Sequence, residues 1–163
     1  MLIWFAAGSV AVVWSIFQSP AVDYRMVMLG SVLAVAEAPF GPGPLDTLAV
    51  SCLALALVMV ATVGHRLWRR RWLGIPIGMF LHLVLDGTWM RTAVFWWPAE
   101  GWRRFAGRSE IVSRGIWSVL LELIGVLLAV WLWGRFGLDD ADRRHVFMRT
   151  GQLERSFVGG RQR

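Results

Sequence analysis

The chain has 163 residues, of which 56% are hydrophobic and 17% are charged, and 11 of them are tryptophan. A soluble domain usually carries about a quarter charged residues, so this composition, together with long apolar runs, indicates an integral membrane protein. The formal net charge of +6 comes from arginines that flank the apolar runs, which is typical of membrane topology rather than of nucleic-acid binding. No zinc-finger spacing or phosphate loop is found, and the single Cys52 excludes an internal disulfide. We therefore expect membrane lipids, and no nucleic acid, as partners.

Five apolar segments predict an all-α integral membrane fold of about five transmembrane helices. The first segment lacks a basic leader and a small-residue cleavage site, so we interpret it as a retained span in preference to a secretory signal. The second is short for a crossing, and it either crosses with tilt or forms a re-entrant arm. Pro76 should kink the fourth. The predicted spans are residues 1–17, 26–38, 45–64, 72–90 and 116–133.

The connecting segments are basic, aromatic or polar. Residues 65–71 contain four arginines and are expected to form a basic loop. Residues 91–114 interleave tryptophan with arginine, which is typical of a segment that lies at the membrane interface. We predict a membrane domain over residues 1–134 and a polar cytoplasmic tail over 135–163, with a short amphipathic helix near 146–157.

The distribution of arginine predicts the orientation of the chain. With five crossings, the segment at Arg25, the loop 65–71 and the tail share one side and carry twelve arginines, whereas the other side carries five. Arginine-rich connecting segments remain in the cytoplasm. We therefore expect an outer N-terminus, a cytoplasmic C-terminus and a location in the bacterial inner (plasma) membrane.

Ionisable residues inside apolar spans are costly and mark candidate functional sites. His82 and Asp86 are four residues apart and so share one face of a helix. In the predicted topology Asp86 lies about 6 Å below the outer end of its span, His82 lies one turn deeper, and Glu122 lies about 9 Å deep in the fifth span. Glu37 ends the second segment and Asp46 begins the third on the same side. We expect these five groups in one leaflet, which favours a shared polar cavity.

Two roles for this set remain open. Imidazole and carboxylate groups are normal ligands for zinc or another divalent ion, which would polarise an ester or phosphate and activate water. In that reading the metal ligands are His82, Asp86, Asp46 and Glu37. In the other, His82, Asp86 and Glu122 form a buried polar network that fixes helix packing. Asp46 by itself also suits the first turn of a helix, where a carboxylate interacts favourably with the helix dipole.

Residues 64–98 resemble a family of bacterial inner-membrane metal-dependent hydrolases that has LexA-regulated members, and in particular its actinobacterial branch. The likeness rests on the H-x-x-x-D pattern of His82 and Asp86, on the context LGIPIGMFLHLVLDGTW, and on the Trp97-Pro98 pair that follows. It extends over about residues 1–98. The resemblance implies a multi-pass scaffold, a divalent-metal site and a hydrolase activity.

The sequence departs from the family pattern at the remaining ligand positions. Family members carry Pro-Asp at the end of the second segment, where this chain offers only Glu37. They carry a histidine before Thr or Ser and Leu, where this chain has Asp46 before Thr47 and Leu48. A histidine near the N-terminus, found in many members, is absent. The resemblance therefore implies a retained scaffold with a changed ligand set.

Three functions follow, in order of preference. The first is a non-catalytic accessory subunit of a larger envelope complex that handles or transports lipid, with other membrane protein subunits as partners. The second is a metal-dependent hydrolase of a lipid or lipid-linked ester or phosphate at the outer leaflet, with one carboxylate as base. The third is a small transporter or proton relay that uses Glu122 and His82. No catalytic residue is assigned.

Overall fold

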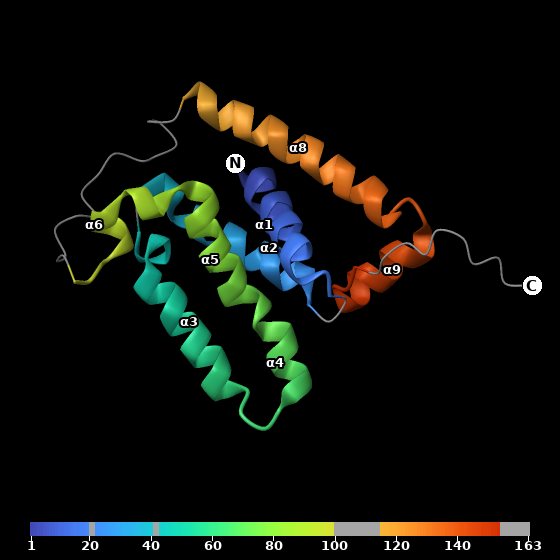
Figure 1. Ribbon diagram of the computed structural model, residues 1–163, viewed down its shortest axis with the longest axis horizontal. Helices are drawn as coiled ribbons and strands as arrows, with labels where there is room; N and C mark the ends of the chain where they lie inside the picture. Colours follow the sequence, from blue (N-terminus) through green and yellow to red (C-terminus); the bar gives the residue numbers. More distant parts are fainter. Residues whose placement is uncertain (20–21, 41–42, 100–114, 154–163) are drawn as a thin grey trace, which may run out of the picture.

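The protein is an all-helical bundle. The structure, a computed structural model, describes residues 1–19, 22–40, 43–99 and 115–153, and it contains no strand within them. Figure 1 shows α3 and the α4–α5 pair side by side, α1 and α2 in the centre, and α8 along one edge. The helices are α1 (Leu2–Phe17), α2 (Tyr24–Leu33), η1 (Ala34–Phe40), η2 (Pro44–Asp46), α3 (Leu48–Ala61), α4 (Arg66–Trp72), α5 (Gly74–Asp86), η3 (Thr88–Met90), α6 (Thr92–Phe95), α8 (Ile116–Phe136) and α9 (Ala141–Thr150).

The most extensive contact in the bundle is between α2 and α5. Gly30 and Gly78 bring the two backbones together, because a Cβ atom on Gly30 would collide with the Ile75 carbonyl and one on Gly78 with the Val27 carbonyl. Small residues at a crossing allow close backbone approach, which increases van der Waals contact between helices. This crossing fixes the height of α5, and with it His82, relative to α2.

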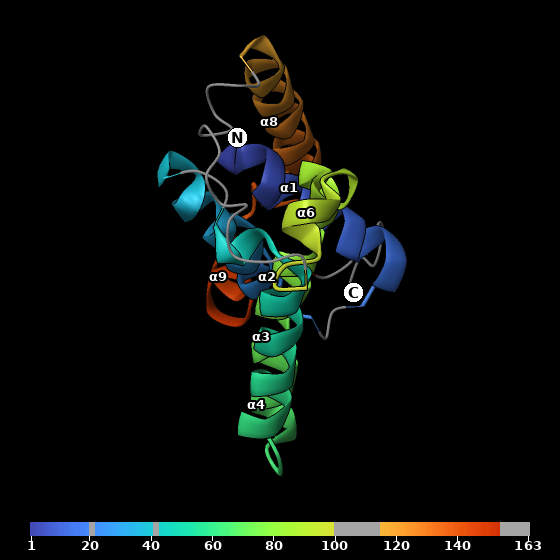
Figure 2. The same ribbon diagram turned by 90° about the vertical axis from the view of Figure 1, so that its left-hand side faces the viewer.

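The apolar core lies between α1, α2 and the second half of α8. Its fully buried side chains include Val13, Tyr24 and Val27, and Phe136 reaches it from α8. α8 passes close to α1 at Gly125, where a Cβ atom would collide with the backbone of Trp4. Figure 2 shows α8 extending in one direction from this centre and the α3–α4 pair in the opposite direction.

The segment after α8 folds back onto the central helices. The Tyr24 backbone N–H donates to the Gly151 carbonyl at 2.9 Å. The Arg25 guanidinium donates to the carbonyls of Met148 and Arg149 at the end of α9, where a cation suits the helix dipole. Leu153 is buried in the core. The described part of the predicted tail is therefore packed against α2 and the apolar core, and the expected boundary at residue 134 falls inside α8.

One helix, α8, is both long and apolar enough to cross a membrane within the described residues, and only 11% of its apolar window is buried in the protein. α1 and α3 are shorter apolar helices of 16 and 14 residues. The all-α fold class is thus confirmed, whereas the structure does not test the number of spans.

Several predicted boundaries differ from the structure. The basic segment 65–71 was expected to be a loop, but Arg66–Trp72 is the helix α4, because arginine is a good helix former and the helix is continued by α5 after a break at Leu73. α5 ends at Gly87, whose φ of 69° is the left-handed conformation that terminates helices. The short helix in the tail begins at Ala141 rather than near residue 146. Most of the predicted interfacial segment 91–114 lies outside the described residues.

Candidate functional site

His82 is held at both ring nitrogens in the contact between α5, α2 and the start of α3. It is 4% exposed, and its ring centroid lies 4.2 Å from that of Phe5 on α1. Its Nδ1 lies 2.8 Å from the backbone carbonyl oxygen of Ser31, and its Nε2 lies 3.3 Å from Oδ1 of Asp46. Asp46 is itself buried, with 8% of its surface exposed.

The Ser31 carbonyl determines which nitrogen of the His82 ring carries a proton. A carbonyl oxygen only accepts hydrogen bonds, so Nδ1 of His82 carries the proton. In a neutral ring Nε2 is then an unprotonated acceptor that faces the carboxylate of Asp46. Within the described residues, no donor forms a hydrogen bond of acceptable geometry with Oδ1 of Asp46. Two facing acceptors need a cation between them. Here that is either a proton, carried by the ring or by the Asp46 carboxyl group, or a metal ion.

Asp46 owes its position to the turn that precedes α3. It ends the short helix η2, and the next residue, Thr47, is the N-cap of α3, with its hydroxyl accepting from the Val50 N–H at 3.3 Å. Thr47 therefore caps α3, and Asp46 lies before that helix rather than in its first turn. This leaves the Asp46 carboxylate aimed at His82.

Glu37 lies near Asp46 but has a partner of its own. Its Oε2 accepts a hydrogen bond of 2.9 Å from the Leu45 backbone N–H. Leu45 immediately precedes Asp46 in η2. Glu37 thus links η1 to the turn that carries Asp46.

Asp86 is one turn beyond His82 on α5, and its carboxylate binds residues that follow the helix. The Arg91 guanidinium and the Thr88 hydroxyl both donate to Oδ2 of Asp86, the latter at 2.9 Å. The side chain of Asp86 is 6% exposed and that of Arg91 is 33% exposed. This ion pair joins α5 to η3 across the turn at Gly87.

Glu122 is separate from these residues. Its carboxylate accepts from the backbone N–H groups of Ile3 and Trp4 at 3.3 and 3.4 Å, and it lies 3.3 Å from the amino group of Met1. It therefore satisfies the free N–H groups at the start of α1. The predicted network of His82, Asp86 and Glu122 is wrong for this member, because Glu122 caps α1 rather than contacting His82.

The predicted metal ligands fit an ion only in part. A metal-bound histidine usually donates its other N–H to a carbonyl or carboxylate, as Nδ1 of His82 does. Two ligands of one tetrahedral zinc at about 2.0–2.1 Å are roughly 3.3–3.4 Å apart, which matches the separation of Nε2 and Oδ1. Catalytic zinc, however, needs three protein ligands, and no group of three or more His, Cys, Asp or Glu side chains suited to a metal occurs within the described residues. The described donors supply two.

Sequence reasoning missed three contributors to this region. The Ser31 carbonyl orients His82, Arg91 neutralises Asp86, and the Ser9 hydroxyl donates to Ser31 Oγ at 3.1 Å. Arg91 could have been found, because a cation shortly after the helix-ending Gly87 is within reach of Asp86. A backbone carbonyl leaves no signal in the sequence.

Comparison of the chain with known protein families, with curated proteins and with solved structures found no match. The resemblance described above accordingly remains an expectation that rests on the residues quoted for it.

Proposed function

We propose that this protein is a multi-pass inner-membrane subunit of a larger lipid-handling envelope complex, and that its polar residues hold the helices together rather than catalyse a reaction. The proposal is carried by the partners of the carboxylates. Asp86 is bound by Arg91 and Thr88, Glu37 by Leu45 N–H, and Glu122 by the start of α1. Residues that pair within the protein in this way stabilise helix packing.

The surface of the molecule supports placement in a membrane. Along α8, large apolar side chains are exposed on several sides, among them Trp117 at 68%, Leu127 at 63% and Val130 at 66%. α3 exposes Leu57 at 60% and Val60 at 73%. Soluble monomers rarely expose apolar patches of this extent. We therefore expect lipid or other membrane subunits to contact these side chains of α8 and α3.

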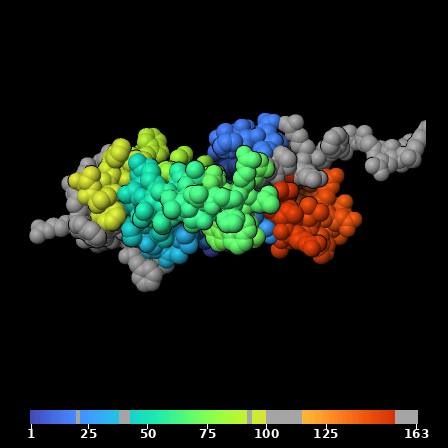
Figure 3. Space-filling model, turned by 90° about the horizontal axis from the view of Figure 1, so that it is seen from below, coloured from blue at the N-terminus to red at the C-terminus, as the bar shows by residue number. Residues whose placement is uncertain are grey.

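The arrangement of the ends supports the predicted orientation. The basic helix α4, Arg25 and α9 lie together, since Arg71 pairs with Asp23 at 3.6 Å and Arg25 binds the end of α9. Figure 3 shows α6 and α9 at opposite ends of the elongated molecule. We assign the α9 end to the cytoplasm, because arginine-rich segments are retained there.

Topology is tested with added cysteines in a Cys52→Ser background. Met90 and Leu67 are exposed at 70% and 81%, so Met90→Cys should react with a membrane-impermeant maleimide in intact cells, whereas Leu67→Cys should react only after permeabilisation. Equal labelling of both in intact cells would contradict the orientation.

Function is tested by gentle purification from the native membrane, with metal content measured in the same fraction. We expect a larger membrane protein to co-elute and the metal to be far below one ion per chain. Elution of the chain alone, with one zinc per chain that His82→Ala abolishes, would overturn the proposal. His65→Ala is the matched control, because His65 is an exposed histidine at the start of α4.

The second candidate function is a metal-dependent hydrolase, and the facing pair of His82 Nε2 and Asp46 Oδ1 is the observation that favours it. His82 and Asp46 would hold a divalent ion, which supplies Lewis-acid activation of an ester or phosphate when bound. Glu37, whose carboxylate is bound to the Leu45 N–H beside Asp46, is the carboxylate placed to accept a proton. Ester or phosphate turnover that is lost in His82→Ala and Asp46→Asn, but kept in His65→Ala, would favour this function over the first.

A further inference from the structure

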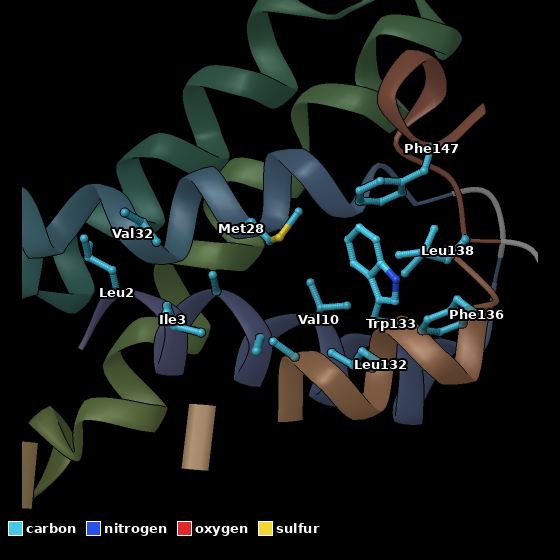
Figure 4. Close-up of a pocket in the computed structure, with 14 residues that line it drawn as sticks. Leu2, Ile3, Val10, Met28, Val32, Leu132, Trp133, Phe136, Leu138 and Phe147 are labelled. Carbon is cyan, nitrogen blue, oxygen red and sulfur yellow. The ribbon is translucent and has the colours of Figure 1, made fainter. Parts of the chain in front are cut away.

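An apolar groove runs along the bundle between α1, α2 and α8. Its volume is about 360 Å³, and all fourteen of its lining residues are apolar. One wall is a face of α1, the second comes from Met28 and Val32 of α2, and the third is the second half of α8. Figure 4 shows Trp133, Phe147 and Leu138 gathered at one end of the groove and Leu2 with Val32 at the other.

We propose that this groove binds one acyl chain of an anionic phospholipid, whose phosphate group lies at Arg143. The inference rests on the membrane placement proposed above, but not on the accessory role. Water has no hydrogen-bond partner on these walls, and an apolar cavity of this kind does not hold ordered water. The occupant is therefore apolar.

The size of the groove selects a chain over a helix. An α-helix with side chains is about 10 Å wide, so 360 Å³ would hold less than about one turn of it. A partner helix, or a second copy of this chain, could therefore place only side chains in the groove and not its backbone. A flexible hydrocarbon chain is slender enough to lie between α2 and α8.

The α9 end of the groove has the features of a membrane interface. The Trp133 ring lines the groove, while its Nε1 donates to Oδ1 of Asp139 at 2.9 Å. A tryptophan with one apolar and one polar side is typical of the headgroup level. α9 closes this end with Phe147, and Arg25 holds α9 in place by binding its last carbonyls.

Charge at this end complements a phosphate. The Arg143 guanidinium lies 3.4 Å from the carbonyl of Phe136, a groove-lining residue, and its side chain is 42% exposed. Its ion pair with Asp140 is long, at 4.0 Å, so the guanidinium can also donate hydrogen bonds to a phosphate.

The test is native mass spectrometry of the full-length protein released from nanodiscs of mixed phosphatidylglycerol and phosphatidylcholine. Ala6 and Ala129 are partly exposed and line opposite walls, so Ala6→Phe and Ala129→Phe each fill the groove. We expect one retained lipid per wild-type chain, and at least about a tenfold loss of that lipid in both variants, which corresponds to about 1.4 kcal/mol. Val130→Phe is the matched control, because Val130 lies beside Ala129 on α8, is 66% exposed and does not line the groove.

A second arm tests the headgroup. Arg143→Gln should abolish the preference for phosphatidylglycerol over phosphatidylcholine, whereas Arg144→Gln, an exposed neighbour on α9, should keep it. Equal lipid retention in wild type and both filled variants would overturn the acyl-chain site, and an unchanged preference in Arg143→Gln would overturn the assignment of Arg143 as the residue that selects an anionic headgroup.

A third arm does not depend on any variant folding. A phospholipid with a diazirine at the end of its acyl chain should label Leu2 and Val32, at the end of the groove away from Arg143, in the wild-type protein, and excess unlabelled phosphatidylglycerol should compete. Labelling confined to the outer faces of α3 and α8, without competition, would contradict the proposal. A protein that binds this lipid but co-elutes with no partner would overturn the accessory function alone.

Discussion

The α2–α5 and α1–α8 contacts both depend on a glycine that allows close backbone approach, but they differ in how many other helices surround them. In both, a glycine lets one helix touch the backbone of the other: Gly78 of α5 at Val27, and Gly125 of α8 at Trp4. α2 and α5 are also contacted by α1 and, for α5, by α3. α8 has α1 as its main neighbour, and beyond the contact at Gly125 its second half forms one wall of the apolar groove. The glycine contact of α5 is covered by α1 and α3, whereas that of α8 leaves much of α8 exposed and one wall of the groove open.

The largest effect is expected when the central contact is forced apart. Gly78→Leu should lower the free energy of unfolding by about 3 kcal/mol or more, because overpacking against a backbone cannot be relieved by moving a side chain. Thermal unfolding in detergent, followed by circular dichroism, measures it. Gly134→Leu is the control, since a Cβ atom at Gly134 meets no atom within 4 Å. Equal stability of the two variants would show that the α2–α5 backbones are not in contact.

The next effect is expected at the polar residues that the central contact holds in place. His82→Ala should cost about 2–3 kcal/mol, because the buried carboxylate of Asp46 and the Ser31 carbonyl lose their partner. The same unfolding measurement applies, and His65→Ala should change stability by less than about 0.5 kcal/mol. If His82→Ala is as stable as His65→Ala, the His82–Asp46 pair does not stabilise the fold, and a role in binding becomes the better explanation.

A smaller effect is expected at the peripheral contact. Gly125→Leu should cost about 1–2 kcal/mol, less than Gly78→Leu, because α8 can move outward without displacing α2 or α5. Hydrogen exchange should rise in α8 and at the start of α1 and stay unchanged in α5. Increased exchange throughout the bundle would show that α8 and α5 open together and would remove the contrast between the two contacts.

The smallest effect is expected at the α9 end. Arg25→Gln should cost about 1 kcal/mol, since exposed charge-assisted hydrogen bonds contribute little each. The expected readout is faster proteolysis between α8 and α9, because Arg25 no longer holds the carbonyls of Met148 and Arg149. Arg144→Gln is the control on α9 itself. Unchanged cleavage in Arg25→Gln would mean that Leu153 and the Tyr24–Gly151 hydrogen bond are sufficient to hold this segment.

The sequence identified the residues of the candidate site, but it did not predict all of the contacts between them. His82 and Asp86 were singled out because they interrupt an apolar helix at one-turn spacing, and both are buried. Asp46 was placed near His82 from topology, and the structure brings them to 3.3 Å. Glu122 was placed in the same leaflet by the same reasoning, yet it binds the start of α1, because depth along a membrane normal does not specify which neighbouring helix a side chain faces.

The sequence by itself determined the helical class and the existence of the main apolar helices, because hydrophobic runs and helix-ending residues such as Gly87 act locally. It also determined which polar residues would be costly to bury. Only the tertiary structure decided which partner each one has, that 141–153 folds back onto Tyr24 and Arg25, and that α1, α2 and α8 enclose an apolar groove. These features depend on contacts between segments up to 124 residues apart. Which segments pair depends on how closely the backbones approach at Gly30, Gly78 and Gly125. That approach is a property of the packed helices and not of any one segment.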